Sequence, residues 1–150
     1  MNDDIRVILI KIADRLHNMR TLGSMLPSKQ YKIAGETLYI YAPLANRLGL
    51  NRIKTELEDL SFKYEHPETY KEIQDKLQAT QAERESVFTE FTAPIRAQLD
   101  KMKIPYRILA RVKSPYSIWN KMQTKHITFE EIYDILLCAS SLLQETKKRN

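Results

Sequence analysis

The segment Ile5-Arg-Val-Ile-Leu-Ile-Lys-Ile-Ala-Asp-Arg-Leu-His-Asn-Met-Arg-Thr-Leu22 decides the fold expected for this chain of 150 residues. Asp3 and Asp4 precede it as acids suited to a helix N-terminus, and Gly23 follows it as a C-terminal breaker. Apolar side chains are so dense in this segment that most of the predicted helix is expected to be buried.

A polar stripe crosses this apolar helix. Its members lie at i, i+3, i+4 and i+7 and are Asp14, His17, Asn18 and Thr21. Because an isolated buried carboxylate is costly, Asp14 is expected to be paired or to bind a metal. The alternative is an internal salt bridge from Asp14 to Arg15 or Lys11, beside a hydrogen-bonded histidine. No zinc pattern, phosphate-binding loop, dinucleotide fingerprint or nucleophile motif is present.

Helices are expected over most of the first hundred residues, because glycine is scarce and helix-forming residues are abundant. A second helix should begin at Ser28 or Lys29 and end near Tyr41, before Pro43, with a turn or short helix over 44–50. A third has its apolar stripe at Ile53, Leu57, Leu60 and Tyr64. Pro67 suits the start of a fourth, with its stripe at Tyr70, Ile73 and Leu77.

The pattern stays helical from 78 to 103, with a kink or break expected at Pro94. The side chains expected to face inward there are Val87, Phe88, Phe91, Ile95 and Leu99.

The composition changes at residue 104. Residues 104–112 favour a strand, and Ser114-Pro115 opens a short helix expected to reach Met122. Thr128 and Glu131 have the spacing of a capping box, which predicts a final turn or helix through 136. A lone strand leaves its backbone groups unpaired, so this α/β part is expected to be incomplete. The predicted fold class is mainly α, with the opening of an α/β domain.

The overall composition is that of an ordered globular chain, with 43% hydrophobic and 29% charged residues. One cysteine, no apolar run of about 18 residues and no signal-peptide pattern favour a cytoplasmic location without membrane contact. The net charge of +5 suits polyanionic partners, although a solvated basic surface gives the same balance.

Several stretches resemble the RelA/SpoT family, the bifunctional synthetase–hydrolases of guanosine tetra- and pentaphosphate, (p)ppGpp, in the stringent response. They are residues 7–22, 33–49, 53–62, 110–122 and 129–135, in family order. The resemblance implies the C-terminal part of an HD-type hydrolase domain over 1–52 and connecting helices over 53–103. It implies the start of a nucleotidyltransferase-like synthetase domain over 104–136.

The resemblance also implies roles for particular residues. In the hydrolase, which uses manganese, Asp14 matches a metal ligand, and Asn18 and Thr21 match positions that contact the guanosine nucleotide. The synthetase transfers pyrophosphate from ATP to the 3′-OH of GTP or GDP with magnesium. Its ATP-contacting residues match Arg111, Lys113, Ser117 and Lys121, and its magnesium ligand matches Asp134. Ala110 departs from the family, where glycine is common.

The family's other catalytic residues lie outside these 150 residues. The resemblance therefore predicts that neither active site is complete here, that the isolated chain is inactive and that it retains no metal. A ribosome link would run through regions absent from it.

The last residues depart from the family. Leu137-Cys-Ala-Ser-Ser-Leu142 stands where the family has a buried strand. Deleting one base from a gene that encodes the family strand would give this sequence instead. Residues 137–150 are thus expected to be a frameshifted or non-native tail, the alternative being a divergent but genuine end. Cys138 would then have no redox or catalytic role.

Two other classes of function remain open. The chain could be a non-catalytic helical module that binds guanosine nucleotides or another chain, or its basic surface could contact RNA or the ribosome. Exposed apolar faces of the first helix would favour self-association.

Overall fold

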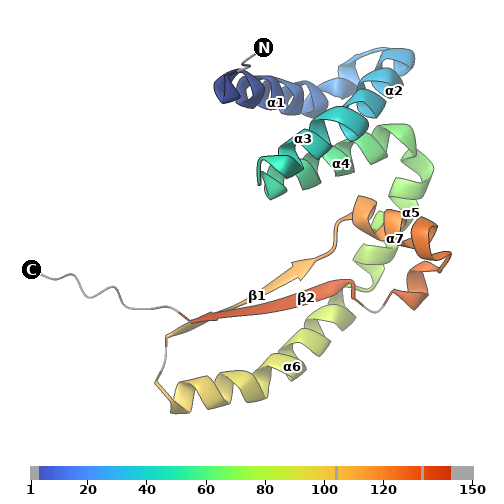
Figure 1. Ribbon diagram of the computed structural model, residues 1–150. Coiled ribbons are helices and arrows are strands. Elements are labelled where there is room, and N and C mark those ends of the chain that lie inside the picture. Colours follow the sequence, from blue (N-terminus) through green and yellow to red (C-terminus); the bar gives the residue numbers. More distant parts are fainter. Residues whose placement is uncertain (1–3, 104, 133, 143–150) are drawn as a thin grey trace, which may run out of the picture. The chain divides into compact units, whose positions relative to one another are not determined.

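The computed structural model describes residues 4–103, 105–132 and 134–142, and they form helices with one pair of strands (Figure 1). The chain divides into two compact units. The first consists of residues 1–74 with 114–120, and the second of residues 75–113 with 121–150. Each unit is therefore assembled from two separate stretches of chain.

The first unit is helical. Its elements are α1 (Ile5–Arg20), η1 (Leu22–Ser24), α2 (Pro27–Glu36), η2 (Thr37–Tyr41), α3 (Ala42–Arg47), α4 (Asn51–Glu65), most of α5 (Pro67–Ala79) and the start of α7 (Pro115–Lys125). Asp4 caps α1, because its carboxylate accepts a hydrogen bond from the Arg6 N–H at 3.1 Å. The expected helix boundaries near Gly23 and His66-Pro67 are confirmed.

The chain stays helical through Pro43, where the sequence predicts an end. The turn η2 is π-helical, and the Ala42 N–H bonds the Thr37 carbonyl. Pro43 follows as the second residue of α3, which continues directly from η2, so a carbonyl of the preceding turn loses the donor that another residue would supply there. Gly49 ends this helical run with a φ of 72°, a left-handed conformation that favours glycine.

The core of the first unit lies where α1, α2, α3 and α4 meet. Its buried members are Ile12, Met19, Leu22, Ala34, Ala42, Ala45 and Leu57. The predicted stripe of the third helix is confirmed, since Ile53, Leu60 and Tyr64 pack against this cluster around Leu57.

The expectation that most of α1 is buried is wrong. Ile12 and Met19 are the buried residues of α1, whereas Ile5, Val7 and Ile10 are 56%, 44% and 69% exposed. Within the described residues, the neighbouring helices cover one side of α1 only, so its other apolar side chains remain in solvent.

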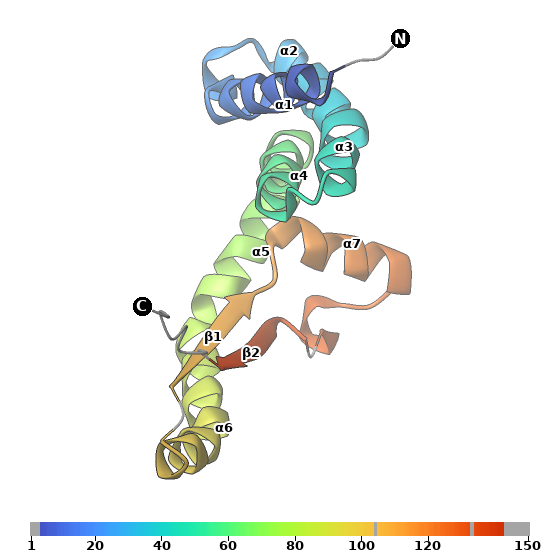
Figure 2. The ribbon, with the colours of Figure 1, turned by 60° about the vertical axis from the view of Figure 1, so that its left-hand side comes forward.

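The second unit is built on two antiparallel strands with α6 (Gln81–Lys101) beside them (Figure 2). Strand β1 (Tyr106–Val112) pairs with β2 (Leu136–Leu142), from Tyr106 opposite Leu142 to Val112 opposite Leu136. The predicted strand is therefore not alone. Its partner begins at residue 136 and continues into the segment expected to be a non-native tail, so the backbone of that segment does complete a sheet.

Helix α6 runs without interruption through Pro94, so the expected break is absent. Pro94 and Glu90 are both exposed, and water can bond the Glu90 carbonyl that the proline leaves without a donor. The inward face of α6 consists of Thr92, which is buried, with Phe88, Ile95 and Leu99, which are half-buried. The inward placement expected for Val87 and Phe91 is wrong. Thr92 can lie on the inward face because its hydroxyl donates to the Phe88 carbonyl at 2.8 Å.

The predicted capping box is present but starts only a single 3-10 turn, η3 (Phe129–Glu131). Of the two alternatives, a turn or a helix through 136, the turn is confirmed and the helix is wrong, because β2 begins at Leu136. No helix in the described part of the chain has both the length and the apolar character needed to cross a membrane.

Candidate functional site

The polar stripe of α1 lies on the surface. Asp14, His17 and Thr21 are exposed and Asn18 is half-buried. The Asn18 amide donates to the Asp14 carboxylate at 3.3 Å, and the Thr21 hydroxyl donates to the His17 carbonyl at 3.1 Å. The burial expected for Asp14 is therefore wrong, and the stripe is open to a ligand from solvent.

The salt bridge considered between Asp14 and Arg15 does not form. Arg15 instead pairs with Glu36 at 2.8 Å, and its guanidinium lies 4.2 Å from the centre of the Tyr41 ring. In the part of the chain that the structure describes, no group of three potential metal ligands lies close enough to hold an ion. Among the described residues, the Asp14 carboxylate thus has the Asn18 amide as its hydrogen-bond partner.

A second cluster of predicted residues comes together in the second unit. Lys113 follows β1, Asp134 precedes β2, and Lys121 lies in α7. Because Val112 is opposite Leu136, the end of one strand lies beside the start of the other, and the Lys113 N–H bonds the Ile135 carbonyl at 2.8 Å. Lys113 Nζ lies 2.7 Å from Asp134 Oδ2, and Lys121 Nζ bonds Asp134 Oδ1.

The electrostatics of this cluster follow from one carboxylate between two ammonium groups. Hydrogen bonds from Lys113 and then Lys121 hold the pKa of Asp134 far below its ordinary value. The side chains of Lys113 and Lys121 are 21% and 23% exposed, so solvent still reaches both. The trio carries a net charge of +1 and forms an accessible cationic site.

Arg111 and Ser117 are placed differently. Arg111 is exposed on β1, and its guanidinium has no ion-pair partner among the described residues. Ser117 belongs to the first unit, where its hydroxyl lies 3.0 Å from the Ser114 hydroxyl. The structure therefore joins Lys113, Lys121 and Asp134 in one cluster and leaves these two residues outside it.

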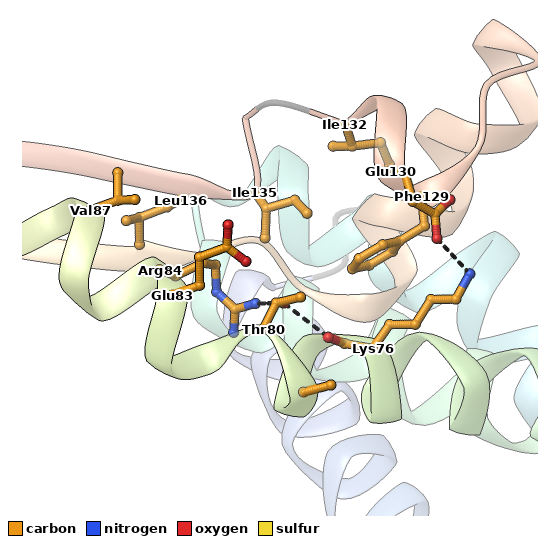
Figure 3. Close-up of a pocket in the computed structure, with 11 residues that line it drawn as sticks. Lys76, Thr80, Glu83, Arg84, Val87, Phe129, Glu130, Ile132, Ile135 and Leu136 are labelled. Carbon is orange, nitrogen blue, oxygen red and sulfur yellow. Dashed lines mark hydrogen bonds and ion pairs between the residues drawn. The ribbon is translucent and has the colours of Figure 1, made fainter.

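A cavity of about 430 Å³ lies elsewhere in the second unit, between the α5–α6 junction and residues 129–136 (Figure 3). Phe129 and Ile135 point into it, and its rim carries an ion pair of Lys76 with Glu130 at 3.1 Å. Arg84 closes one side by donating to the Leu77 carbonyl at 2.6 Å. None of the predicted site residues lines it.

The sequence analysis missed a group of residues that links α4 to α7. Asp59 accepts a hydrogen bond from the Tyr116 N–H at 3.0 Å, and the Phe62 ring stacks on the Trp119 ring at 4.9 Å. His66 lies 5.0 Å from the same indole. The available signal was the spacing of positions 59, 62 and 66 at the end of α4 and just after it.

Comparison with known proteins first gives the class of domain to which the N-terminal helices belong. The family described as HD domain matches residues 1–51. This confirms the expected type of domain and the mainly α fold.

Three relatives then identify the family. The chain is 49% identical to a GTP pyrophosphokinase of Myxococcus xanthus over 91% of its length. It is 48% identical over 90% to the bifunctional (p)ppGpp synthase/hydrolase SpoT of Escherichia coli. It is 47% identical over 98% to a Synechocystis protein named probable guanosine-3′,5′-bis(diphosphate) 3′-pyrophosphohydrolase. The predicted resemblance is thereby confirmed: the chain is a member of the RelA/SpoT family of (p)ppGpp synthetases and hydrolases.

The extent of these matches is also informative. The chain spans only 18–19% of the length of these three relatives. The Synechocystis match, covering 98% of the chain, reaches into residues 137–150. The frameshifted origin of those residues stays a prediction.

Proposed function

We propose that these residues belong to a cytoplasmic stringent-response enzyme that makes and hydrolyses (p)ppGpp. Residues 1–52 would be the end of its HD-type hydrolase domain, 53–103 its connecting helices and 104–136 the start of its synthetase domain. The observation that carries this proposal is the Asp134 carboxylate between Lys113 and Lys121, in a chain that matches such enzymes over nine-tenths of its length.

The cationic cluster suits the triphosphate of ATP. Ammonium groups neutralise phosphates as point charges, and both lysines are reachable from solvent. Phosphate oxygens would compete with Asp134 for the two ammonium groups, so ATP binding would release the carboxylate. The exposed Arg111 would add a guanidinium that can stack on the adenine, and Ser117 would add a hydroxyl to the phosphates.

Asp134 also fits the magnesium ion of such a reaction. Magnesium is commonly held by one or two carboxylates together with substrate phosphates, so a single protein ligand suffices here. When bound, the ion would neutralise charge on the triphosphate. An aspartate is ionised at neutral pH, as a metal ligand has to be, and the two lysines lower the pKa of Asp134 further.

The α1 stripe would serve the hydrolase. Asp14 would be one ligand of a manganese ion, and Asn18 and Thr21 would contact the guanosine nucleotide. A lone exposed carboxylate cannot hold a catalytic ion, so the other ligands would have to come from beyond the residues that the structure describes.

We therefore expect the isolated 150 residues to have neither activity. Incubation with guanosine tetraphosphate and manganese should release no pyrophosphate above a protein-free control. Catalytic release by the pure chain would show that a complete hydrolytic site exists within it.

Nucleotide binding tests the assignment directly. The chain should bind ATP in the presence of magnesium, measured by isothermal titration calorimetry. Replacing Lys121 by Ala should weaken binding about tenfold, the typical effect of losing one charge-assisted hydrogen bond. Lys125→Ala, an exposed lysine one turn further along α7, is the matched control and should bind as the wild type does.

Two results would count against the proposal. No ATP binding by the wild-type chain would contradict the synthetase assignment, and equal effects of the two substitutions would show non-specific attraction to positive charge. Binding of guanosine tetraphosphate without ATP, abolished by Asn18→Ala, would favour a nucleotide-binding module instead. The exposed polar stripe of α1 is the observation that favours this second candidate, a nucleotide-binding module.

A further inference from the structure

The N-terminus of α7 is held by a carboxylate from another helix. Asp59 Oδ1 of α4 accepts the Tyr116 N–H at 3.0 Å. Tyr116 is the second residue of α7, where a backbone N–H has no partner within the helix. Asp59 therefore acts as a capping group supplied by α4.

This cap leaves no free backbone donor in the first turn. Pro115 has no N–H, the Ser117 N–H points to the Ser114 hydroxyl at 3.4 Å, and the Ile118 N–H bonds the Ser114 carbonyl at 3.0 Å. An incoming phosphate would consequently have to be bound by side chains rather than by the helix N-terminus.

Aromatic contacts dock the same end of α7 on α4. The Phe62 ring stacks on Trp119 at 4.9 Å and meets Tyr116 edge-on at 6.1 Å. His66 lies 5.0 Å from the indole, and Ile118 is fully buried. Tyr116 and Trp119 are three residues apart, so they form one face of α7.

The residues proposed to bind ATP lie on a different face of α7. Ser117 and Lys121 are four residues apart and share a face, rotated from that of Tyr116 and Trp119. A helix fixed at its first turn and along one side cannot rotate about its axis. The contacts with α4 therefore determine the direction in which Ser117, in the same unit, points.

We propose that Asp59 is a positioning residue for ATP binding, because its hydrogen bond to the first turn of α7 orients Ser117, which belongs to the same unit. This inference rests on the proposed function. It assigns a role in nucleotide affinity to a residue in the connecting helices that touches no nucleotide.

The test measures ATP affinity, with magnesium, of variants at position 59 in the whole chain. Asp59→Ala removes the acceptor and should weaken ATP binding about five- to tenfold, in line with the usual effect of losing a helix cap. Asp59→Asn keeps an acceptor oxygen and should bind within about threefold of the wild type. Glu58→Gln is the matched control, because this neighbouring carboxylate pairs with Lys54 of its own helix.

A second readout follows α7 itself. Trp119 is the only tryptophan of the chain, so its fluorescence reports on the docking of α7. Asp59→Ala should shift this emission and Asp59→Asn should not. If far-UV circular dichroism shows that the alanine variant is unfolded, Asp59→Glu replaces it, since the longer side chain keeps the charge but misplaces the acceptor.

The outcomes are distinguishable. If the wild type binds ATP and Asp59→Ala, or its glutamate replacement, binds equally well, the positioning role is wrong and the proposed function stands. If Asp59→Asn is as weak as Asp59→Ala, the charge rather than the hydrogen bond matters and the inference is overturned. If the wild type binds no ATP, the proposed function fails and the positioning role fails with it.

Discussion

Replacing Phe62 by Leu should destabilise the first unit and change the environment of Trp119. Phe62 is 1% exposed, and its ring contacts His66, Tyr70, Tyr116 and Trp119 at centroid distances of 4.9–6.1 Å. An aromatic pair contributes about 0.5–1.5 kcal/mol beyond the area it buries. Leucine keeps part of the dispersion contacts, so the expected loss in the free energy of unfolding is about 2 kcal/mol, less than the ~3–5 kcal/mol typical of Phe→Ala.

Urea denaturation followed by two probes measures this effect. Tryptophan fluorescence reports on the α4–α7 contact, and far-UV circular dichroism reports on helix content. Phe91→Leu is the control, because Phe91 is 61% exposed and the same change there should alter stability by less than about 0.5 kcal/mol. Equal stability of the two variants, with unchanged Trp119 emission in Phe62→Leu, would refute the assignment of Phe62 as the centre of the contact.

Other substitutions test the core, the helices and the charges. Leu57→Ala in the core should lower the free energy of unfolding by about 2–5 kcal/mol in urea titrations, and a loss below 1 kcal/mol would contradict its full burial. Pro94→Ala should raise the melting temperature, since proline is disfavoured inside an exposed helix; a decrease would show that Pro94 has a packing role. Arg20 lowers the pKa of Glu56 through hydrogen bonds. Their pairing therefore stabilises the fold when the pH is above the unfolded pKa of Glu, and this stabilisation is lost as the pH falls. Arg20→Gln should lower the free energy of unfolding at neutral pH and leave it unchanged in acid. Burial raises the pKa of Asp59, so the folded state binds more protons than the unfolded state does. The free energy of unfolding should therefore decrease as the pH rises from about 4. Asp59→Asn should reduce this dependence on pH, and an unchanged dependence would contradict the effect of burial.

The helices with regular apolar spacing were predictable from the sequence. The stripe at Ile53, Leu57 and Tyr64 places α4 correctly, because a periodic face has to be buried against something. Lys113, Lys121 and Asp134 were selected by their resemblance to a family motif, and the structure adds that their charges are in contact.

Other features depend on what packs against each element. Apolar density in α1 predicted burial, yet a local sequence does not show whether neighbouring helices cover both sides. Thr92 occupies an inward position because its hydroxyl bonds the backbone, which a hydrophobic pattern does not count. Asp59 was missed for the same reason, since its partner is a backbone N–H 57 positions further along the chain.

The discontinuity of the first unit has a consequence for synthesis on the ribosome. Residues 114–120 complete this unit, but α6 and β1 are made before them. At about 5–20 residues per second, the roughly 40 residues between Gln74 and Ser114 impose a delay of some seconds. During that interval the nascent chain exposes the Phe62 ring that Trp119 later covers, and this is the period in which a co-translational chaperone would find an apolar surface on α4.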